Sequence, residues 1–235
     1  MAIKAGMQRM FGTPLLIDTI DDPQMIADLE KAILARRAAE PGIVRSNTGG
    51  GWHSDLMLHQ WGGDAAQKLI RHAMAIATRN TVDIAAQNGV RAGWAAESWA
   101  NVNERGGANA RHVHGGSYWS AVFYVRVDEG SGGELVLHDP RMPMLAMHAP
   151  TLRFRNAGGE RLVKLKPTPG LLILFPSWLA HEVEPWDGDG MRISIAINLT
   201  ATRTRTVGGT LRQGDAAAGA AAVASIPQAP ATKDV

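Results

Sequence analysis

Apolar residues in the N-terminal part of the chain recur at helical spacing, and two segments are predicted to be helices, residues 22–39 and residues 64–87. In the first segment Asp21 or Asp22 can cap the helix N-terminus. Pro23 suits the first turn, because a backbone N–H at that position would have no partner inside the helix. The chain is therefore predicted to begin with helices.

From Ser98 onward, apolar and polar residues alternate instead, which is the period of strands with one buried face. Seven segments are predicted to be strands: 97–104, 118–127, 133–138, 151–155, 161–166, 170–175 and 191–199. Helices followed by a run of short strands predict an α+β chain with a β-sandwich or jelly-roll core.

We expect a single structural domain in which residues 1–96 form a helical support for a β core made of residues 97–205. Residues 213–235 are rich in Ala, Gly and Pro and contain no aromatic residue, so a disordered tail is predicted there. The sequence therefore predicts one folded unit followed by one tail.

Composition narrows the classes of protein and of site. The chain has 235 residues, no Cys and a net charge of +2, so disulfide scaffolds and thiolate metal sites are excluded and any metal must be held by His, Asp or Glu. No dense Lys/Arg block suggests nucleic-acid binding. No apolar run approaches a membrane span, and no signal peptide is recognised, so a cytoplasmic protein is expected.

The first candidate for chemistry is the pair His112 and His114, which follows a Gly-rich turn and precedes a predicted strand. In extended chain, residues i and i+2 point the same way, so both imidazoles can reach one metal ion. Taken alone, the pair also fits two exposed loop histidines.

The second candidate lies further along, where an apolar strand and a turn present His181, and Arg192 and Ser194 follow on the strand 191–199. Arg192 and Ser194 share one face of that strand, and three isoleucines occupy the other. An arginine inside a barrel would require an anion, because an unpaired buried charge is costly. Taken alone, the alternation favours Arg192 on the solvent face and the isoleucines in the core.

Taken together and in this order, the motifs over roughly residues 10–200 resemble the Fe(II)/2-oxoglutarate-dependent dioxygenase superfamily. The resemblance is greatest to the prolyl-hydroxylase-like branch and its group of bacterial and phage 2-oxoglutarate–Fe(II) oxygenases. Three further blocks are similar to that group: Trp52-His53-Ser54, Tyr118–Val125 and Asp139-Pro140-Arg141. The fold implied is the double-stranded β-helix, a jelly-roll, cupin-like barrel with N-terminal helices packed on one sheet.

The resemblance also implies roles for individual residues. His112 and His181 match the two iron-binding histidines, and Arg192 matches the arginine that pairs with the distal carboxylate of 2-oxoglutarate. Three more residues match co-substrate contacts of the branch: Ser194, Tyr124 and Asn103. A guanidinium suits this role because its planar fork can bind a carboxylate through two parallel hydrogen bonds.

His114 departs from the pattern, since the superfamily usually has Asp or Glu at that position. Four interpretations follow. His114 is a third neutral iron ligand, or Asp139 supplies the missing acid, since Glu182 faces away from His181. Alternatively, His114 contacts a metal ligand or the substrate and leaves a two-His iron, as in the related halogenases, or oxygenase activity is lost. A third neutral ligand would leave the iron more positive and favour anionic co-ligands.

The expected function is that of an oxygenase that uses Fe(II), 2-oxoglutarate and O₂, forms succinate and CO₂, and hydroxylates a C–H bond of a small-molecule or amino-acid-type substrate. The alternatives are a non-enzymatic jelly-roll that binds a carboxylate, and a three-His dioxygenase that does not use 2-oxoglutarate. The pair Arg192 and Ser194 favours the 2-oxoglutarate oxygenase over the three-His dioxygenase, because only the former needs a fork for a dicarboxylic acid. Neither nucleic acid nor membrane is expected as a partner, and a homodimer is compatible with the sequence.

Overall fold

A computed structural model describes residues 11–84, 90–141, 151 and 161–205. The predicted tail, 213–235, and all but the first residue of the predicted strand 151–155 lie outside the described residues. In the described part of the chain, no helix is both long enough and apolar enough to cross a membrane.

The first helix, α1 (Pro23–Ala39), forms where predicted, and Asp22 caps it by accepting a hydrogen bond from the Met25 N–H at 3.0 Å. The second predicted helix is shorter than expected: α3 (Gly63–Arg79) ends eight residues before residue 87. The side chains of Asn80 and Thr81 donate hydrogen bonds to carbonyls of the last helical turn, and these bonds cap the helix C-terminus there. A short helix not predicted from the sequence, α2 (Leu58–Trp61), precedes α3.

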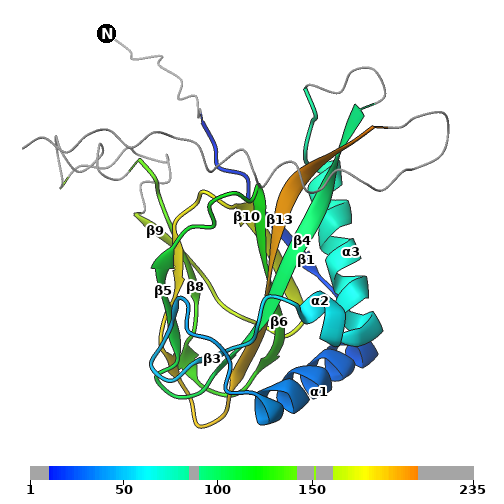
Figure 1. Cartoon of the computed structure of the whole chain (residues 1–235). Coiled ribbons are helices and arrows are strands. Elements are labelled where there is room, and N and C mark those ends of the chain that lie inside the picture. The colour runs from blue at the N-terminus through cyan, green and yellow to red at the C-terminus, as the bar shows by residue number, and fades with distance from the viewer. Residues whose placement is uncertain (1–10, 85–89, 142–150, 152–160, 206–235) are drawn as a thin grey trace, which may run out of the picture.

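The described strands form two main antiparallel sheets and one small ribbon (Figure 1). The large sheet has the order β1 (Leu16–Thr19), β10 (Leu171–Pro176), β6 (Trp119–Val127), β13 (Arg192–Arg205), β4 (Val90–Asn103) and β3 (Trp52–His53). The small sheet has the order β2 (Asn47–Thr48), β5 (Ala108–His112), β11 (His181–Val183), β8 (Leu135–His138) and β9 (Leu162–Leu165). The ribbon pairs β12 (Trp186–Asp187) with β7 (Ser131–Gly132).

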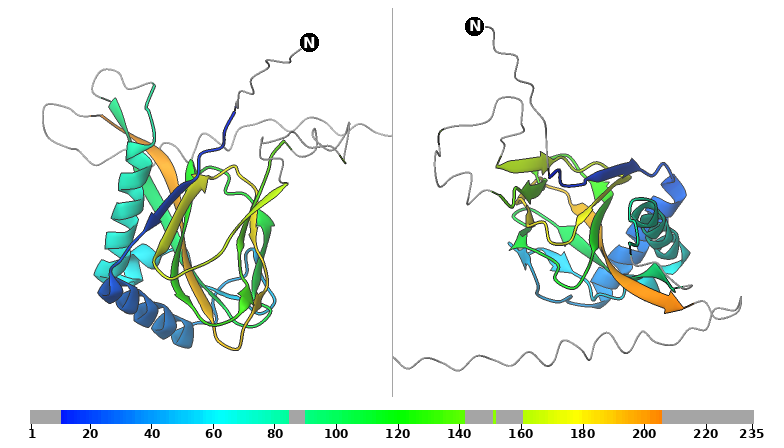
Figure 2. Two further views of the ribbon diagram at one scale, coloured as in Figure 1. Left: turned by 180° about the vertical axis from the view of Figure 1, so that it is seen from behind. Right: turned by 90° about the horizontal axis from the view of Figure 1, so that it is seen from above.

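The helices cover the outer face of the large sheet, as Figure 2 shows from behind and from above. Leu29 and Ile33 of α1 and Leu69 of α3 share a buried apolar cluster with the odd-numbered residues of β13. Those residues are the three isoleucines, Ile193, Ile195 and Ile197, together with Leu199. The face of β13 that the helices cover is thus the apolar face, and its isoleucines lie in the core as the alternation predicts.

The chain passes back and forth between the two sheets, with β4, β6, β10 and β13 in the large one and β5, β8 and β11 in the small one. A smaller apolar cluster, centred on Phe175 and Leu135, fills part of the space between them. The arrangement is the expected double-stranded β-helix with helices on one sheet. The expected division at residues 96 and 97 falls inside β4, and β1 and β3 bring residues before it into the large sheet.

Candidate metal centre and co-substrate pocket

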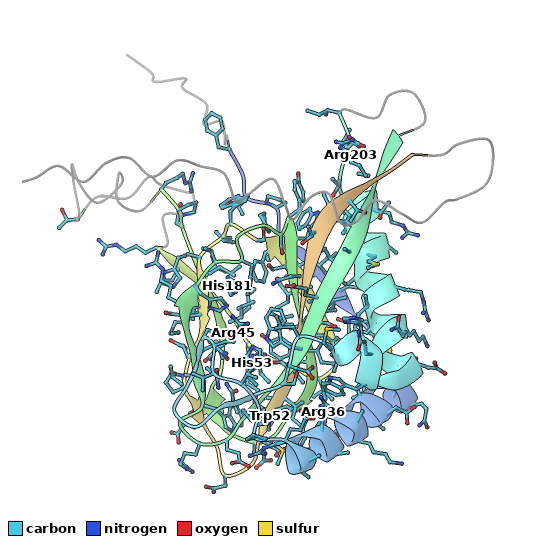
Figure 3. All side chains as sticks on the ribbon, in the orientation of Figure 1. Arg36, Arg45, Trp52, His53, His181 and Arg203 are labelled. Carbon is cyan, nitrogen blue, oxygen red and sulfur yellow. The ribbon has the colours of Figure 1, made fainter. Side chains whose placement is uncertain are left out.

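Three histidines from neighbouring segments meet between the sheets. His112 at the end of β5 lies directly opposite His181 at the start of β11 in the antiparallel register. His114 follows two residues after His112, and its backbone N–H donates to the Ser177 carbonyl at 3.0 Å. One ligand atom from each ring lies within 4.8 Å of the others. Figure 3 shows His181 among the side chains between the two sheets.

Backbone carbonyls orient two of the three imidazoles. Nδ1 of His112 lies 2.7 Å from the Ala110 carbonyl, and Nδ1 of His181 lies 2.8 Å from the Leu179 carbonyl. A carbonyl can only accept a hydrogen bond, so in both rings Nδ1 carries the proton and Nε2 keeps its lone pair. A metal-binding histidine has this tautomer when its other nitrogen is held by a backbone carbonyl.

Burial favours the neutral form of two of the three imidazoles, His114 and His181. It lowers the pKa of His114 to about 3, with a smaller contribution from the neighbouring His181 and His112. It also lowers the pKa of His181 to about 4, with His112 adding to the effect. Neutral imidazoles are the form that binds a metal, and these two rings therefore have lone pairs available at neutral pH.

The alternative acid, Asp139, is held elsewhere. Its two carboxylate oxygens accept hydrogen bonds from Nε and Nη2 of Arg141 at 2.9 and 2.8 Å, and this bonding lowers the pKa of the carboxyl. Glu182 also turns away from the cluster, because its carboxylate lies 3.4 Å from Nε2 of His138. Within the described residues, the group able to hold a metal consists of three histidines without a carboxylate.

Arg192 lies on the inner face of β13 and is fully buried. Its Nη1 donates to the Ser194 hydroxyl at 3.1 Å, and its guanidinium lies over the Tyr124 ring, 4.9 Å from the ring centroid. Nε and Nη2 have no hydrogen-bond partner. Because Ser194 and Tyr124 are neutral and burying an unpaired charge is costly, this guanidinium fits an anionic ligand. The expectation from alternation alone, that Arg192 faces solvent, is wrong.

The residues around the guanidinium are also left with unpaired polar atoms. Asn103, which pairs with Arg192 in the register between β4 and β13, is fully buried and both its side-chain polar atoms lack partners. Asn101 lies opposite Ser194, and its Oδ1 is buried without a partner. The Tyr124 hydroxyl is likewise unpaired, and burial raises its pKa, so it remains a donor. Such a cluster of unsatisfied groups is what a polar ligand would satisfy.

A single cavity joins these two groups of residues. It encloses about 450 Å³ of space, part of it open to solvent, and its lining includes the three histidines together with Arg192 and Ser194. The predicted residues Tyr124 and Asn103 lie beside this lining.

Sequence reasoning did not single out two of the lining residues, Trp99 and Asn101. Asn101 precedes Asn103 by two positions on a strand, so the same alternation that places Asn103 on the inner face could have found it. His53, from the Trp52-His53-Ser54 block, is buried and stacks on Trp99, with ring centroids 5.5 Å apart.

Residues 97–198 match the family described as "Putative 2OG-Fe(II) oxygenase". No curated protein matches the chain.

Three solved structures show how widely the fold is shared, and each alignment covers most of both chains. A Pseudomonas putida prolyl-4-hydroxylase is 17% identical over 80% of this chain and 92% of that chain, with a TM-score of 0.53. A Trichoplax adhaerens prolyl hydroxylase in complex with a hypoxia inducible factor peptide fragment is 16% identical over 79% and 83%, with a TM-score of 0.54. HygX from Streptomyces hygroscopicus, with nickel and 2-oxoglutarate bound, is 12% identical over 80% and 83%, with a TM-score of 0.53. The family match covers 102 of the 235 residues, and the fold that the chain shares with these structures is the one that the sequence resemblance to 2-oxoglutarate–Fe(II) oxygenases implies.

Proposed function

We propose that this protein is an oxygenase that binds Fe(II) at His112, His114 and His181 and uses 2-oxoglutarate as co-substrate. The observation that carries the proposal is the buried guanidinium of Arg192, which has two unpaired nitrogens in a cavity that also holds a three-histidine cluster. When bound, Fe(II) supplies the activation of O₂ that couples decarboxylation of 2-oxoglutarate to oxidation of a C–H bond. Succinate and CO₂ are the co-products.

Arg192 binds the distal carboxylate of 2-oxoglutarate in this proposal. Nε and Nη2 lie on one edge of the guanidinium, and both are free, so they can donate two parallel hydrogen bonds to the two oxygens. Ser194 already holds Nη1 and fixes the orientation of the fork. The Tyr124 hydroxyl and the Asn103 amide, both buried and unpaired, add donors to the same carboxylate.

The three histidines bind the metal through the nitrogens left free by their surroundings. The carbonyls of Ala110 and Leu179 hold the Nδ1 protons of His112 and His181, so Nε2 of each is the ligand atom. His114 is the third ligand because its ring lies against both others, with centroid distances of 4.8 and 5.0 Å. Asp139, paired with Arg141, is the less suitable third ligand.

The substrate in this proposal is a small molecule or an amino-acid-type group, as in the neighbours whose names mention a peptide fragment or a prolyl residue. Such a substrate would reach the metal from the half-buried side of the cluster, where His112 and His114 lie. A cytoplasmic location and a homodimer stay predictions from the sequence.

The test is an anaerobic titration of the metal-free protein with Fe(II) and then 2-oxoglutarate, followed by visible absorption. Chelation of the metal by 2-oxoglutarate is expected to produce a weak charge-transfer band, and admission of O₂ is expected to release succinate. A matched variant, Arg192→Ala, should bind Fe(II) normally and lose the band at the same 2-oxoglutarate concentration. If neither the band nor succinate appears with the wild-type protein, the carboxylate-binding module or the three-His dioxygenase becomes the better interpretation.

A further inference from the structure

The proposed metal site, on which this inference rests, holds its three histidine rings in two different ways. Backbone carbonyls accept hydrogen bonds from Nδ1 of His112 and His181 and so fix both rings. Within the described residues the His114 ring has no hydrogen bond of this kind, and the Ser177 carbonyl holds its backbone N–H instead. The orientation of the His114 ring therefore depends on the side chains packed against it.

Trp99 of β4 packs against the His114 ring from outside the histidine cluster. The two ring centroids are 5.6 Å apart and the ring planes are inclined by 62°, which is close to the edge-to-face arrangement that aromatic rings prefer. Trp99 lines the cavity and is 7% exposed. Turning the His114 ring about its Cβ–Cγ bond would break this arrangement, so the contact favours one orientation of the imidazole.

A second ring holds Trp99 in turn. His53, labelled in Figure 3, stacks on Trp99 with the ring centroids 5.5 Å apart and the planes within 10° of parallel. Nδ1 of His53 donates to the Ser54 carbonyl at 2.5 Å, which fixes the His53 ring. The Ser54 N–H donates to the Ala100 carbonyl, and the Ala100 N–H donates to the Ser54 hydroxyl, both at 3.0 Å. These bonds tie the stack to β4.

Core packing does not account for the position of Trp99. Among the described residues, Trp99 is buried but belongs to neither of the two apolar clusters. Trp94, on the same strand, packs against the helix-covered cluster, which is the opposite face of β4. The ring contacts of Trp99 are with His53 and His114, so its surroundings are those of the site.

We propose that Trp99, supported by His53, is a positioning residue that holds the His114 ring in the orientation needed to bind the metal. A carboxylate at position 114 would offer two oxygens with several lone-pair directions, whereas a neutral imidazole offers one lone pair in the plane of its ring. A histidine ligand therefore needs a fixed ring where an acid does not. The aromatic stack does for His114 what the backbone carbonyls do for the other two ligands.

The test is a Co(II) titration of the metal-free full chain, followed by the visible spectrum of Co(II), which reports the number and arrangement of its ligands. Trp99→Leu and His53→Leu should each weaken Co(II) binding by about 10–100-fold, the range for losing a residue that orients a ligand, and should change the spectrum. Trp99→Phe and His53→Phe keep a flat ring in the stack, so their affinity and spectrum should stay near those of the wild type. Trp94→Leu is the matched control on the opposite face of β4 and should leave Co(II) binding unchanged.

Thermal unfolding of the metal-free variants separates positioning from a purely structural role. A structural role would lower the Tm of Trp99→Leu and leave its Co(II) affinity and spectrum as in the wild type, and this result would overturn the inference alone. Equal weakening in Trp94→Leu would overturn it too, because the effect would then be a general one. If Trp99→Leu does not fold, the comparison of His53→Leu with His53→Phe decides, and equal Co(II) affinity in that pair overturns the inference. Failure of the wild-type protein to bind Co(II) would overturn the proposed function as well.

Discussion

Replacing Arg192 by methionine separates ligand binding from folding, because the guanidinium is buried without an anionic partner. Methionine keeps most of the length and apolar contact of the side chain and removes only the charge and its donors. In the ligand-free protein, the substitution relieves the desolvation of an unpaired cation. It also removes the bond to Ser194 and the contact with the Tyr124 ring.

These effects can be compared in magnitude. One hydrogen bond contributes about 1 kcal/mol and a desolvated cation–π contact about 2 kcal/mol, and both are lost. Burial of an ion costs several kcal/mol, and that cost disappears. We therefore expect the ligand-free Arg192→Met variant to be between equally stable and about 3 kcal/mol more stable than the wild type. Most buried substitutions are destabilising, so this outcome is diagnostic.

The assay is thermal unfolding with Mn(II), with and without 2-oxoglutarate. At a ligand concentration of about 100 times Kd the wild-type protein should gain about 2.7 kcal/mol, or roughly 5–10 °C in Tm for a domain of this size. Arg192→Met should gain almost nothing. The reasoning is refuted if 2-oxoglutarate stabilises the variant as much as the wild type. It is also refuted if the ligand-free variant loses more than about 2 kcal/mol, since the charge would then have a structural partner.

Three further predictions concern the metal site, the pH dependence and the space around the guanidinium. Metal content should fall sharply in His114→Ala and stay unchanged in Asp139→Ala, as measured by metal analysis after dialysis; the opposite result would make Asp139 the third ligand. The folded-state pKa values of His114 and His181, about 3 and about 4, lie below the ordinary value of 6.5, so the unfolded chain takes up protons first as the pH falls. Urea unfolding of the metal-free protein should therefore show full stability above about pH 6.5 and a loss of up to about 3 kcal/mol per pH unit toward pH 4. The free energy of unfolding of His114→Phe should depend less steeply on pH, and an equal slope in both proteins would contradict the assignment. Gly133 has a φ of +67°, and a Cβ there would lie 2.8 Å from Cδ of Arg192. Gly133→Ala should therefore weaken 2-oxoglutarate binding in a calorimetric titration while metal affinity is retained. Unchanged 2-oxoglutarate affinity would show that the guanidinium can shift without loss of binding.

Local sequence signals predicted the elements that they control. The Asp22 cap and Pro23 defined the start of α1, a continuous apolar run identified β10, and the period of two identified β6 and much of β13. The strands of two residues could not be predicted, because pairing with distant segments forms them. The end of α3 depended on the side chains of Asn80 and Thr81, which compete for the last carbonyls.

The site was only partly accessible to the same reasoning. Alternation placed Arg192 and Ser194 on one face of a strand, but it could not tell the inner face from the outer one. That choice depends on the helices, which cover the isoleucine face and leave the polar face toward the small sheet. The meeting of His112 with His181 depends on the register between β5 and β11, which residues far apart in the chain determine.

The two faces of β13 impose different limits on change. Inserting or deleting a single residue in this strand would exchange the isoleucines with the ligand-binding side chains, so folding and co-substrate binding would fail together. The length of β13 is therefore constrained both by core packing and by co-substrate binding. The connection from His114 to β6 lies outside the large sheet, and insertions after His114 do not shift a strand register. New substrate preferences can thus arise in this connection without altering the strand that holds Arg192.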